Sequence, residues 1–369
     1  MLVNKVKLLN FKNYTDAEFA LEPGINCILG ANGSGKTNLL DAIHYLSMTK
    51  SAFNSTDTQS IHHETTFFSI IASLEGTDGN HDIFCSLKKG AKKIFKFDNN
   101  EYDKLSDHIG CFPSVIISPG DINMIQAGNE TRRKFFDSII CQTDFAYLND
   151  LMAYNHNLKQ RNSLLKYFRD NLIADQDLIA PYDKVLIEKG QKIFNKRQKF
   201  IDKYCPTFKE KYAFISNGNE TVDLQYASQF SEESPLQQLA FSLSKDIDLQ
   251  RSSFGTHRDQ WQFTLNQRDL KKFGSQGQQK TFLISLKTAQ FDLIKEEKGF
   301  APVLLLDDIF DKLDDYRIHQ LMLLIASDDH GQMFLTDARP ERTKSILESL
   351  NLTATMFYID NGKLINEKN

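Results

Sequence analysis

The sequence predicts an α/β fold in which a mainly helical domain is inserted into a strand-rich domain. Strand patterns separated by turns occupy roughly the first 120 residues and return after residue 252. Between them, from about residue 132 to residue 212, apolar residues follow helical spacing and only one glycine occurs. The chain has 369 residues, enough for two domains. We therefore expect a strand-rich domain of residues 1–125 and 249–369, interrupted by a mainly helical domain of residues 126–248.

Composition and charge bound the class of protein. The apolar content of 41% and the charged content of 25% are those of an ordinary globular chain. A net charge of −4 argues against binding to nucleic acid through overall basicity, although a local basic surface would still suffice. No stretch of 18 uncharged apolar residues occurs, and the N-terminal run contains lysines, so we expect neither a membrane span nor a signal peptide. Five cysteines without a CxxC pair predict a reducing, cytoplasmic location: Cys27, Cys85, Cys111, Cys141 and Cys205.

The first part of the chain alternates predicted strands with turns. "NKVKLLNF" alternates polar and apolar residues, and "GINCILG" is a short buried strand that ends at a glycine-rich turn. "TNLLDAIHYLSM" then has helical spacing, and "FFSIIASL", "HDIFCSL" and "PSVIIS" predict further strands.

The remaining elements follow from the same patterns. In the middle segment the heptad pattern is broken repeatedly, which argues against a long coiled coil. After it, "QWQFTL" predicts a strand, a cluster of glycine and glutamine precedes an amphipathic helix, and "PVLLLDD" and "QMFLTD" predict two more strands.

The glycine-rich turn is a predicted phosphate-binding loop. Residues 30–37 match GxxxxGK[ST] between a predicted strand and a predicted helix, which is the context that this motif requires. Its backbone N–H groups and the helix N-terminus would hold phosphates, Lys36 would reach the β- and γ-phosphates, and Thr37 would bind Mg²⁺. The predicted nucleotide-binding residues are Gly30, Ala31, Asn32, Gly33, Ser34, Gly35, Lys36, Thr37 and Asn38.

Two carboxylates at the end of "PVLLLDD" are expected to complete this site. We assign Asp307 to Mg²⁺, directly or through water, and Asp308 to orienting or deprotonating the attacking water. The alternative is that both merely end a strand at a solvated turn. Guanine recognition normally requires [NT]KxD, and the nearest string, "DKLD" at residues 311–314, lacks the first residue, so ATP is favoured over GTP.

The cluster of glycine and glutamine suggests a second phosphate-binding element. Ser275, Gln276, Gly277 and Gln278 precede a predicted helix, whose N-terminus can bind an anion. Within one subunit the phosphate loop already supplies the contacts to the bound phosphates. We therefore expect this segment to complete the site of a partner subunit in a head-to-tail dimer. The alternative is a simple polar turn.

These three features together resemble the ABC-type ATPases, whose signature motif is S-x-G-Q. Seven segments resemble the bacterial RecF family, in its order and over nearly the whole chain: "NFKNY", "GANGSGKTNLLDAIHYL", "SPGDINMIQAGNETRRKFFD", "YNHNLKQRNSLLK", "GTHRD", "GSQGQQKT" and "LLLDDIFDKLD". The resemblance implies an ABC-type P-loop ATPase head with a mainly helical inserted domain and no long coiled coil. It also implies ATP-dependent dimerisation and sequence-independent DNA binding at single-strand gaps, together with RecO and RecR, to help load RecA during DNA repair.

Four departures from the family pattern affect these expectations. Related ABC-type proteins place a histidine where this chain has Thr336 and Asp337, and a glutamine loop near residues 118–121, where no glutamine stands. The family usually reads G-P-H-R-D-D where this chain has "GTHRDQ" at residues 255–260. Many ABC-type enzymes carry glutamate where Asp308 stands, and the shorter aspartate would position water less well. We therefore expect weak, DNA-stimulated ATP hydrolysis that acts as a switch.

Two lysine-rich stretches are candidate DNA contacts, through backbone phosphates rather than bases. "KKGAKKIFKF" lies on a predicted hairpin, and "KGQKIFNKRQKFIDKY" sets lysines along one helical face. Either would also read as an ordinary solvated surface. The residues assigned are Lys88, Lys89, Lys92, Lys93, Lys192, Lys196 and Lys199. Two other classes remain open, an ATPase subunit of a nuclease-linked system and, less compatible with the helical insertion, the nucleotide-binding subunit of a transporter.

Overall fold

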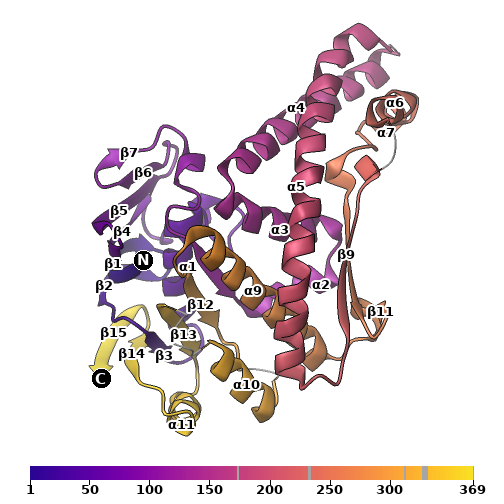
Figure 1. Ribbon diagram of the computed structural model, residues 1–369. Helices are drawn as coiled ribbons and strands as arrows, with labels where there is room; N and C mark the ends of the chain where they lie inside the picture. Colours follow the sequence, from indigo (N-terminus) through magenta and orange to yellow (C-terminus); the bar gives the residue numbers. More distant parts are fainter. Residues whose placement is uncertain (173, 232–233, 311–312, 326–330, 369) are drawn as a thin grey trace. The chain divides into compact units, whose positions relative to one another are not determined.

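The computed structural model describes residues 1–172, 174–231, 234–310, 313–325 and 331–368 (Figure 1). The chain forms two compact units. Unit 1 comprises Met1–Ile122, Lys211–Gly218 and Ser275–Asn369, and unit 2 comprises Asn123–Glu210 and Asn219–Gly274. No helix among the described residues is both long enough and apolar enough to cross a membrane.

The division differs from the predicted boundaries at more than one segment. Residues 211–218, which we expected in the helical domain, lie in unit 1, and residues 123–125, which we expected in the strand-rich domain, lie in unit 2. Residues 249–274, which we expected with the strand-rich domain, lie in unit 2. The reason is strand pairing: β10 (Gln260–Leu265) lies between β9 (Val222–Ala227) and β11 (Arg268–Asp269) in a three-stranded antiparallel sheet. A strand cannot be assigned to a sheet before its partner is known.

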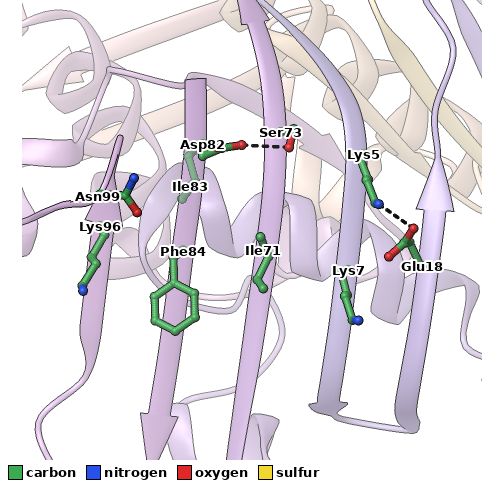
Figure 2. Close-up of a pocket in the computed structure, with 10 residues that line it drawn as sticks. All are labelled: Lys5, Lys7, Glu18, Ile71, Ser73, Asp82, Ile83, Phe84, Lys96 and Asn99. Carbon is green, nitrogen blue, oxygen red and sulfur yellow. Dashed lines mark hydrogen bonds and ion pairs between the residues drawn. The ribbon is translucent and has the colours of Figure 1, made fainter. Parts of the chain in front are cut away.

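Unit 1 contains a six-stranded antiparallel sheet in the order β2-β1-β4-β5-β6-β7. Side chains alternate between its two faces, so one face packs into the main apolar core and the other carries polar and apolar groups such as Lys7, Ile71 and Phe84 (Figure 2). The strands are β1 (Leu2–Phe11), β2 (Tyr14–Ala20), β4 (Phe67–Gly76), β5 (Gly79–Lys88), β6 (Ile94–Phe97) and β7 (Asn100–Glu101).

The second sheet of unit 1 has the order β15-β14-β3-β13-β12-β8, parallel except for the β14–β15 pair. Its strands β3, β12 and β8 are almost entirely buried, as is typical of parallel strands. In this strand order, β13 lies between β3 and β12. The strands are β3 (Ile25–Leu29), β8 (Ser114–Ile117), β12 (Val303–Asp307), β13 (Met333–Asp337), β14 (Ala354–Asp360) and β15 (Lys363–Lys368).

Helices of unit 1 follow these strands. α1 (Lys36–Met48) comes directly after the loop that ends β3 and packs against β8, β12 and β13. α9 (Gln276–Lys298) packs against β8, and its buried residues run along most of its length. The other two helices are α10 (Asp315–Ile325) and α11 (Pro340–Ser349).

Unit 2 is mainly helical, with the small β9–β11 sheet. Its core includes Phe136 stacked on Trp261, with ring centroids 3.9 Å apart. α5 begins in this unit and continues into unit 1. Its helices are α2 (Asn123–Gln126), α3 (Asn129–Thr143), α4 (Phe145–Asn171), α5 (Gln176–Ser216), α6 (Pro235–Phe241), α7 (Leu243–Leu249) and α8 (Leu270–Phe273). The sheets of unit 1 and the mainly helical unit 2 are those of the expected α/β fold with a helical second domain.

Candidate nucleotide site

The predicted phosphate loop lies between β3 and α1, as the motif requires. Two of its glycines have backbone conformations that exclude a side chain. At Gly30, φ is 156° and a Cβ would lie 2.2 Å from the carbonyl oxygen of Ile359. At Gly35, φ is 121° and a Cβ would lie 2.7 Å from Nδ2 of Asn13. The loop shape therefore depends on these two glycines.

Neighbouring residues hold the outer carbonyls of the loop. Tyr14 donates its hydroxyl to the carbonyl of Gly35 at 2.9 Å, and Asn13 donates Nδ2 to the carbonyl of Ser34 at 3.0 Å. The backbone N–H of Gly362 donates to the same Ser34 carbonyl at 2.8 Å. With its carbonyls fixed from outside, the loop keeps a defined shape around the N-terminus of α1, whose first N–H groups have no acceptor within the helix.

Lys36 is folded over its own loop. Its Nζ donates to the carbonyls of Gly30 at 2.8 Å and Ala31 at 2.9 Å, and the residue is 8% exposed. Burial lowers the pKa of Lys36, while Asp308 and Asp307 act in the opposite direction. The hydroxyl of Ser34, also in this loop, is buried without a hydrogen-bond partner among the described residues. A buried ammonium and an unsatisfied hydroxyl fit a loop built to take phosphate oxygens.

The acidic residues meet the loop at the carboxyl ends of the parallel strands. Thr37 donates its hydroxyl to Oδ1 of Asp307 at 2.8 Å, although 270 residues separate the two in the chain. Thr336, at the end of β13, donates to the same oxygen at 2.8 Å and accepts from the backbone N–H of Asp308 at 3.0 Å. Burial raises the pKa of Asp307, against the lowering effect of the bonds from Thr37 and Thr336.

A cavity of about 260 Å³ lies where these groups converge. Thr37 and Asp307 offer adjoining oxygen atoms of the kind that Mg²⁺ prefers, and would hold that ion. Asp308 lines the cavity with its backbone in the left-handed region, at φ 47°. Its lining residues are Asn32, Gly33, Gly35, Lys36, Thr37, Asn38, Pro119, Asp307, Asp308 and Thr336.

The predicted signature lies outside this cavity. Ser275 caps α9, accepting from the backbone N–H of Gln278 at 3.3 Å, while the Gln278 side chain accepts from the N–H of Ser275 at 2.8 Å. Ser275 and Gln276 are exposed. At Gly277 a Cβ would lie 2.7 Å from Nη1 of Arg317, so a side chain here would displace the flexible end of that arginine.

The hairpin lysines do not behave alike. Lys88, Lys89 and Lys92 are exposed at the end of β5 and in the turn before β6. Lys93, by contrast, is withdrawn from solvent: its Nζ pairs with Asp57 at 2.6 Å. We therefore correct the assignment of Lys93 as a phosphate contact, because this ammonium also donates to the buried Tyr45 hydroxyl at 3.1 Å and to the Thr49 carbonyl at 2.6 Å.

The helical lysines lie on α5, as their spacing predicts. All three lysines are exposed, and two of them form ion pairs, Lys192 with Glu188 at 3.1 Å and Lys196 with Asp144 at 2.5 Å. Part of the basic charge on this face is therefore neutralised by carboxylates of the same unit.

The sequence left the role of Thr336 open, and the structure places its hydroxyl against Asp307. Thr336 stands at the end of "QMFLTD", and the available signal was that this strand ends with a hydroxyl and a carboxylate. Of the segment at residues 311–314 used to weigh ATP against GTP, residues 311 and 312 lie outside the described residues.

Known proteins resemble this chain over nearly its whole length. A family model described as the RecF/RecN/SMC N-terminal domain matches residues 2–358. A DNA replication and repair protein RecF of Flavobacterium johnsoniae is 46% identical over 97% of this chain and 99% of its own length. The RecF of Cytophaga hutchinsonii is 42% identical over 99% of this chain and 96% of its own length. This chain belongs to the RecF family.

Solved structures agree with that membership. The recombination mediator protein RecF with ATP, described within the RecFOR pathway, has a TM-score of 0.89 and 28% identity, covering all of this chain and 98% of that one. An SMC head bound to the C-terminal winged-helix domain of ScpA has a TM-score of 0.58 at 17% identity, covering 99% of this chain and 98% of that one. The second likeness shows that this chain shares the fold of SMC heads.

Proposed function

We propose that this protein is an ATP-dependent DNA-binding protein of DNA replication and recombinational repair. The observation that carries the proposal is the contact between Thr37 and Asp307 beside Lys36, which joins a phosphate loop to a distant acidic strand end in one cavity. Lys36 and the loop N–H groups would hold the phosphates of ATP, and Thr37 and Asp307 would hold Mg²⁺. Bound ATP would supply the γ-phosphoryl group, and its hydrolysis would end the ATP-bound state of the protein.

ATP is proposed to join two copies head to tail. The supporting observation is that Ser275 and Gln276 are exposed at the N-terminus of α9 and do not line the cavity of their own chain. A helix N-terminus favours an anion, so this surface suits the phosphates held by a partner's loop. Contacts made only in the closed dimer would then bias the equilibrium towards it.

Hydrolysis is proposed to be weak, stimulated by DNA, and to act as the release step. Asp308 is one methylene shorter than glutamate and would orient water as a base from the cavity wall. The proposed DNA contacts are Lys88, Lys89 and Lys92, together with the exposed Lys192, Lys196 and Lys199 on α5. The RecF structure with ATP is described within the RecFOR pathway. We accordingly propose action at single-strand gaps with RecO- and RecR-type partners to help load RecA.

Sedimentation velocity tests this proposal. Wild-type protein is expected to sediment as a monomer alone, as a dimer with ATP, and with gapped DNA only when ATP is present. Lys36→Ala should lose ATP binding and dimerisation together, whereas Ser275→Arg should bind ATP yet remain monomeric. Lys344→Ala, on the exposed side of α11, is the control and should match wild type.

Two results would contradict the proposal. One is a wild-type protein that stays monomeric with ATP and does not sediment with gapped DNA. The other is fast ATP turnover that DNA leaves unchanged, because a metabolic enzyme rather than a switch would behave in that way.

A further inference from the structure

A second polar cavity lies within unit 2, and the proposed ATP switch gives it no role. Its volume is about 360 Å³. It is lined by residues of α3, α4 and α5 and by the segment between α7 and β10. Three of the segments that carry the family resemblance meet here, namely residues 118–137, 154–166 and 255–259. The lining residues are Glu130, Arg133, Lys134, Asp137, Leu151, Tyr154, Asn155, Asn162, Arg197, Arg251, Ser252, Thr256, His257 and Arg258.

Positive charge exceeds negative charge in this cavity. Arg197 is buried and neutralised, since it pairs with Asp137 at 2.9 Å and with Asp259 at 2.6 Å. Lys134 pairs with Glu130 at its exposed edge. Three further arginines form no ion pair with any carboxylate in the part of the chain that the structure describes: Arg133, Arg251 and Arg258.

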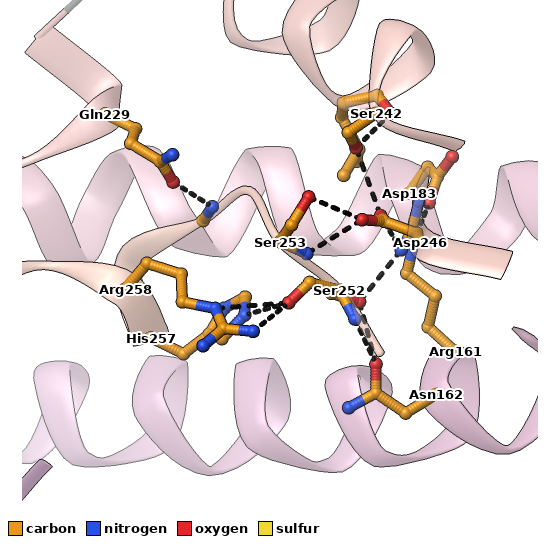
Figure 3. Close-up of polar contacts among 12 residues, drawn as sticks. Arg161, Asn162, Asp183, Gln229, Ser242, Asp246, Ser252, Ser253, His257 and Arg258 are labelled. Atoms are coloured by element: carbon orange, nitrogen blue, oxygen red, sulfur yellow. Dashed lines mark hydrogen bonds and ion pairs between the residues drawn. The ribbon is translucent and has the colours of Figure 1, made fainter. Parts of the chain in front are cut away.

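Two of these arginines are held in place by backbone carbonyls. Arg133 donates Nη1 to the carbonyl of Asp259 at 2.7 Å. Arg258 donates Nε at 3.2 Å and Nη2 at 2.9 Å to the carbonyl of Ser252 (Figure 3). A carbonyl orients a guanidinium without neutralising it. Burial, and next the neighbouring Arg197, lower the pKa of Arg133, while Asp259, Asp137 and Glu130 act in the opposite direction.

The segment that carries Arg258 is fixed by a buried network (Figure 3). Arg161 donates Nη1 to Oγ of Ser252 at 2.8 Å and to Oδ2 of Asp246 at 2.7 Å, and both Arg161 and Asp246 are fully buried. Asn162 accepts from the backbone N–H of Ser252 at 2.8 Å. The network holds the carbonyl on which Arg258 depends, so the guanidinium is positioned before any ligand arrives.

Histidine does not supply the charge of this cavity. His257 accepts at Nδ1 from the hydroxyl of Tyr154 at 2.8 Å and donates Nε2–H to the carbonyl of Ser252 at 3.1 Å. Burial lowers the pKa of His257 to about 4, so the ring is neutral near pH 7. Gly255 is required beside it, because φ is 137° and a Cβ would lie 2.3 Å from the Tyr154 hydroxyl.

We propose that this cavity binds a phosphodiester of the DNA backbone through Arg133, Arg251 and Arg258, an inference that rests on the proposed DNA-binding function. Guanidinium groups match phosphate oxygens in geometry and charge. Glu130, Lys134 and Arg251 are exposed at the rim, so a backbone phosphate can enter from the surface. Tyr154 is buried, leaving no exposed aromatic ring among the lining residues on which a base would stack. The contact is therefore independent of sequence.

The test measures duplex affinity in the presence of ATP over a range of salt concentrations. Arg133→Gln, Arg251→Gln and Arg258→Gln are each expected to reduce the slope of log affinity against log salt by about 0.9, which corresponds to about eightfold weaker binding at 0.1 M salt. Arg169→Gln is the matched control. It removes the same charge from exposed α4 outside the cavity, where Asp248 already neutralises it, and should bind DNA like wild type.

Neutral DNA linkages distinguish a direct phosphate contact from an indirect effect. A duplex with methylphosphonate linkages should weaken wild-type binding, and the same duplex should cost Arg251→Gln less, because one contact is already missing. Because Arg251 is exposed, its substitution should leave the fold of the cavity intact. ATP affinity without DNA checks that unit 1 is intact in every variant.

The outcomes separate this inference from the proposed function. If wild-type protein with ATP does not bind duplex DNA, both fail. If wild type binds DNA and the three cavity variants keep its affinity and salt slope, only the assignment of the cavity to DNA is overturned. The same result is expected if the cavity binds an acidic protein segment instead of DNA. Equal weakening by Arg169→Gln would likewise overturn the assignment of the cavity to DNA.

Discussion

Replacing Thr336 by valine separates the role of its hydroxyl from that of its volume. Thr336 is fully buried at the end of β13, and valine has nearly the same shape. Its hydroxyl makes two bonds, donating to Asp307 and accepting from the backbone N–H of Asp308. The substitution therefore removes the link between the two acidic residues while leaving the Thr37–Asp307 contact in place.

The size of the effect follows from these two bonds. A carboxylate that holds Mg²⁺ and loses an orienting partner typically costs 10- to 100-fold in metal affinity, or about 1.4–2.8 kcal/mol. The N–H of Asp308 loses its acceptor, which costs about 1–3 kcal/mol of folding stability when the group is shielded from water. Asp308 is only half-buried, so we expect the lower end of the stability range.

Equilibrium binding of a fluorescent ATP analogue, titrated with Mg²⁺, measures the effect without relying on turnover. Thr336→Val should raise the Mg²⁺ concentration at half-saturation at least tenfold, and Thr336→Ser, which keeps the hydroxyl, should restore most of the loss. Wild-type Mg²⁺ dependence in Thr336→Val would refute the argument that this hydroxyl positions Asp307.

Two predictions concern residues outside the site. Lys93→Met should lower stability by about 2 kcal/mol in urea unfolding, because it leaves Asp57 without its cation, whereas exposed Lys92→Met should change little; equal stability of the two variants would contradict the correction made above. Burial lowers the pKa of His108 from its ordinary 6.5 to about 4. Between pH 7 and pH 5 the His108 imidazole therefore binds a proton in the unfolded chain but stays neutral in the folded chain. The free energy of unfolding falls by about 2 kcal/mol over this range. Between pH 7 and pH 5, His108→Gln should lose about 2 kcal/mol less unfolding free energy than wild type. If the variant and wild type have the same pH dependence of unfolding, His108 does not cause the loss.

The geometry of the candidate nucleotide site follows largely from local determinants. Gly30 and Gly35 are needed where a strand turns sharply into a helix, and that need is visible as a short motif. Asp307 could be placed because a buried apolar run ends directly before it. Both predictions use strand ends, and parallel strands bring their carboxyl ends to one edge of the sheet.

What could not be predicted depends on pairing between distant segments. Thr336 joins the site because β13 lies between β3 and β12, an order that no local pattern fixes. Lys93 has the same sequence environment as Lys92, yet only Lys93 meets Asp57, which lies 36 residues earlier. The first of these outcomes adds a residue to the candidate nucleotide site, and the second removes one from the candidate DNA contacts.

The two halves of the proposed dimeric site share one helix. α9 begins at the signature, and farther along it the buried Lys287 pairs with Asp121 at 3.2 Å. Asp121 in turn accepts from the backbone N–H of Ser118 at 2.7 Å, and Pro119 between them lines the nucleotide cavity. A shift of this wall would strain a buried ion pair on the helix that presents Ser275. In the proposed dimer, the geometry of a chain's own cavity therefore bears directly on how that chain meets the nucleotide of its partner.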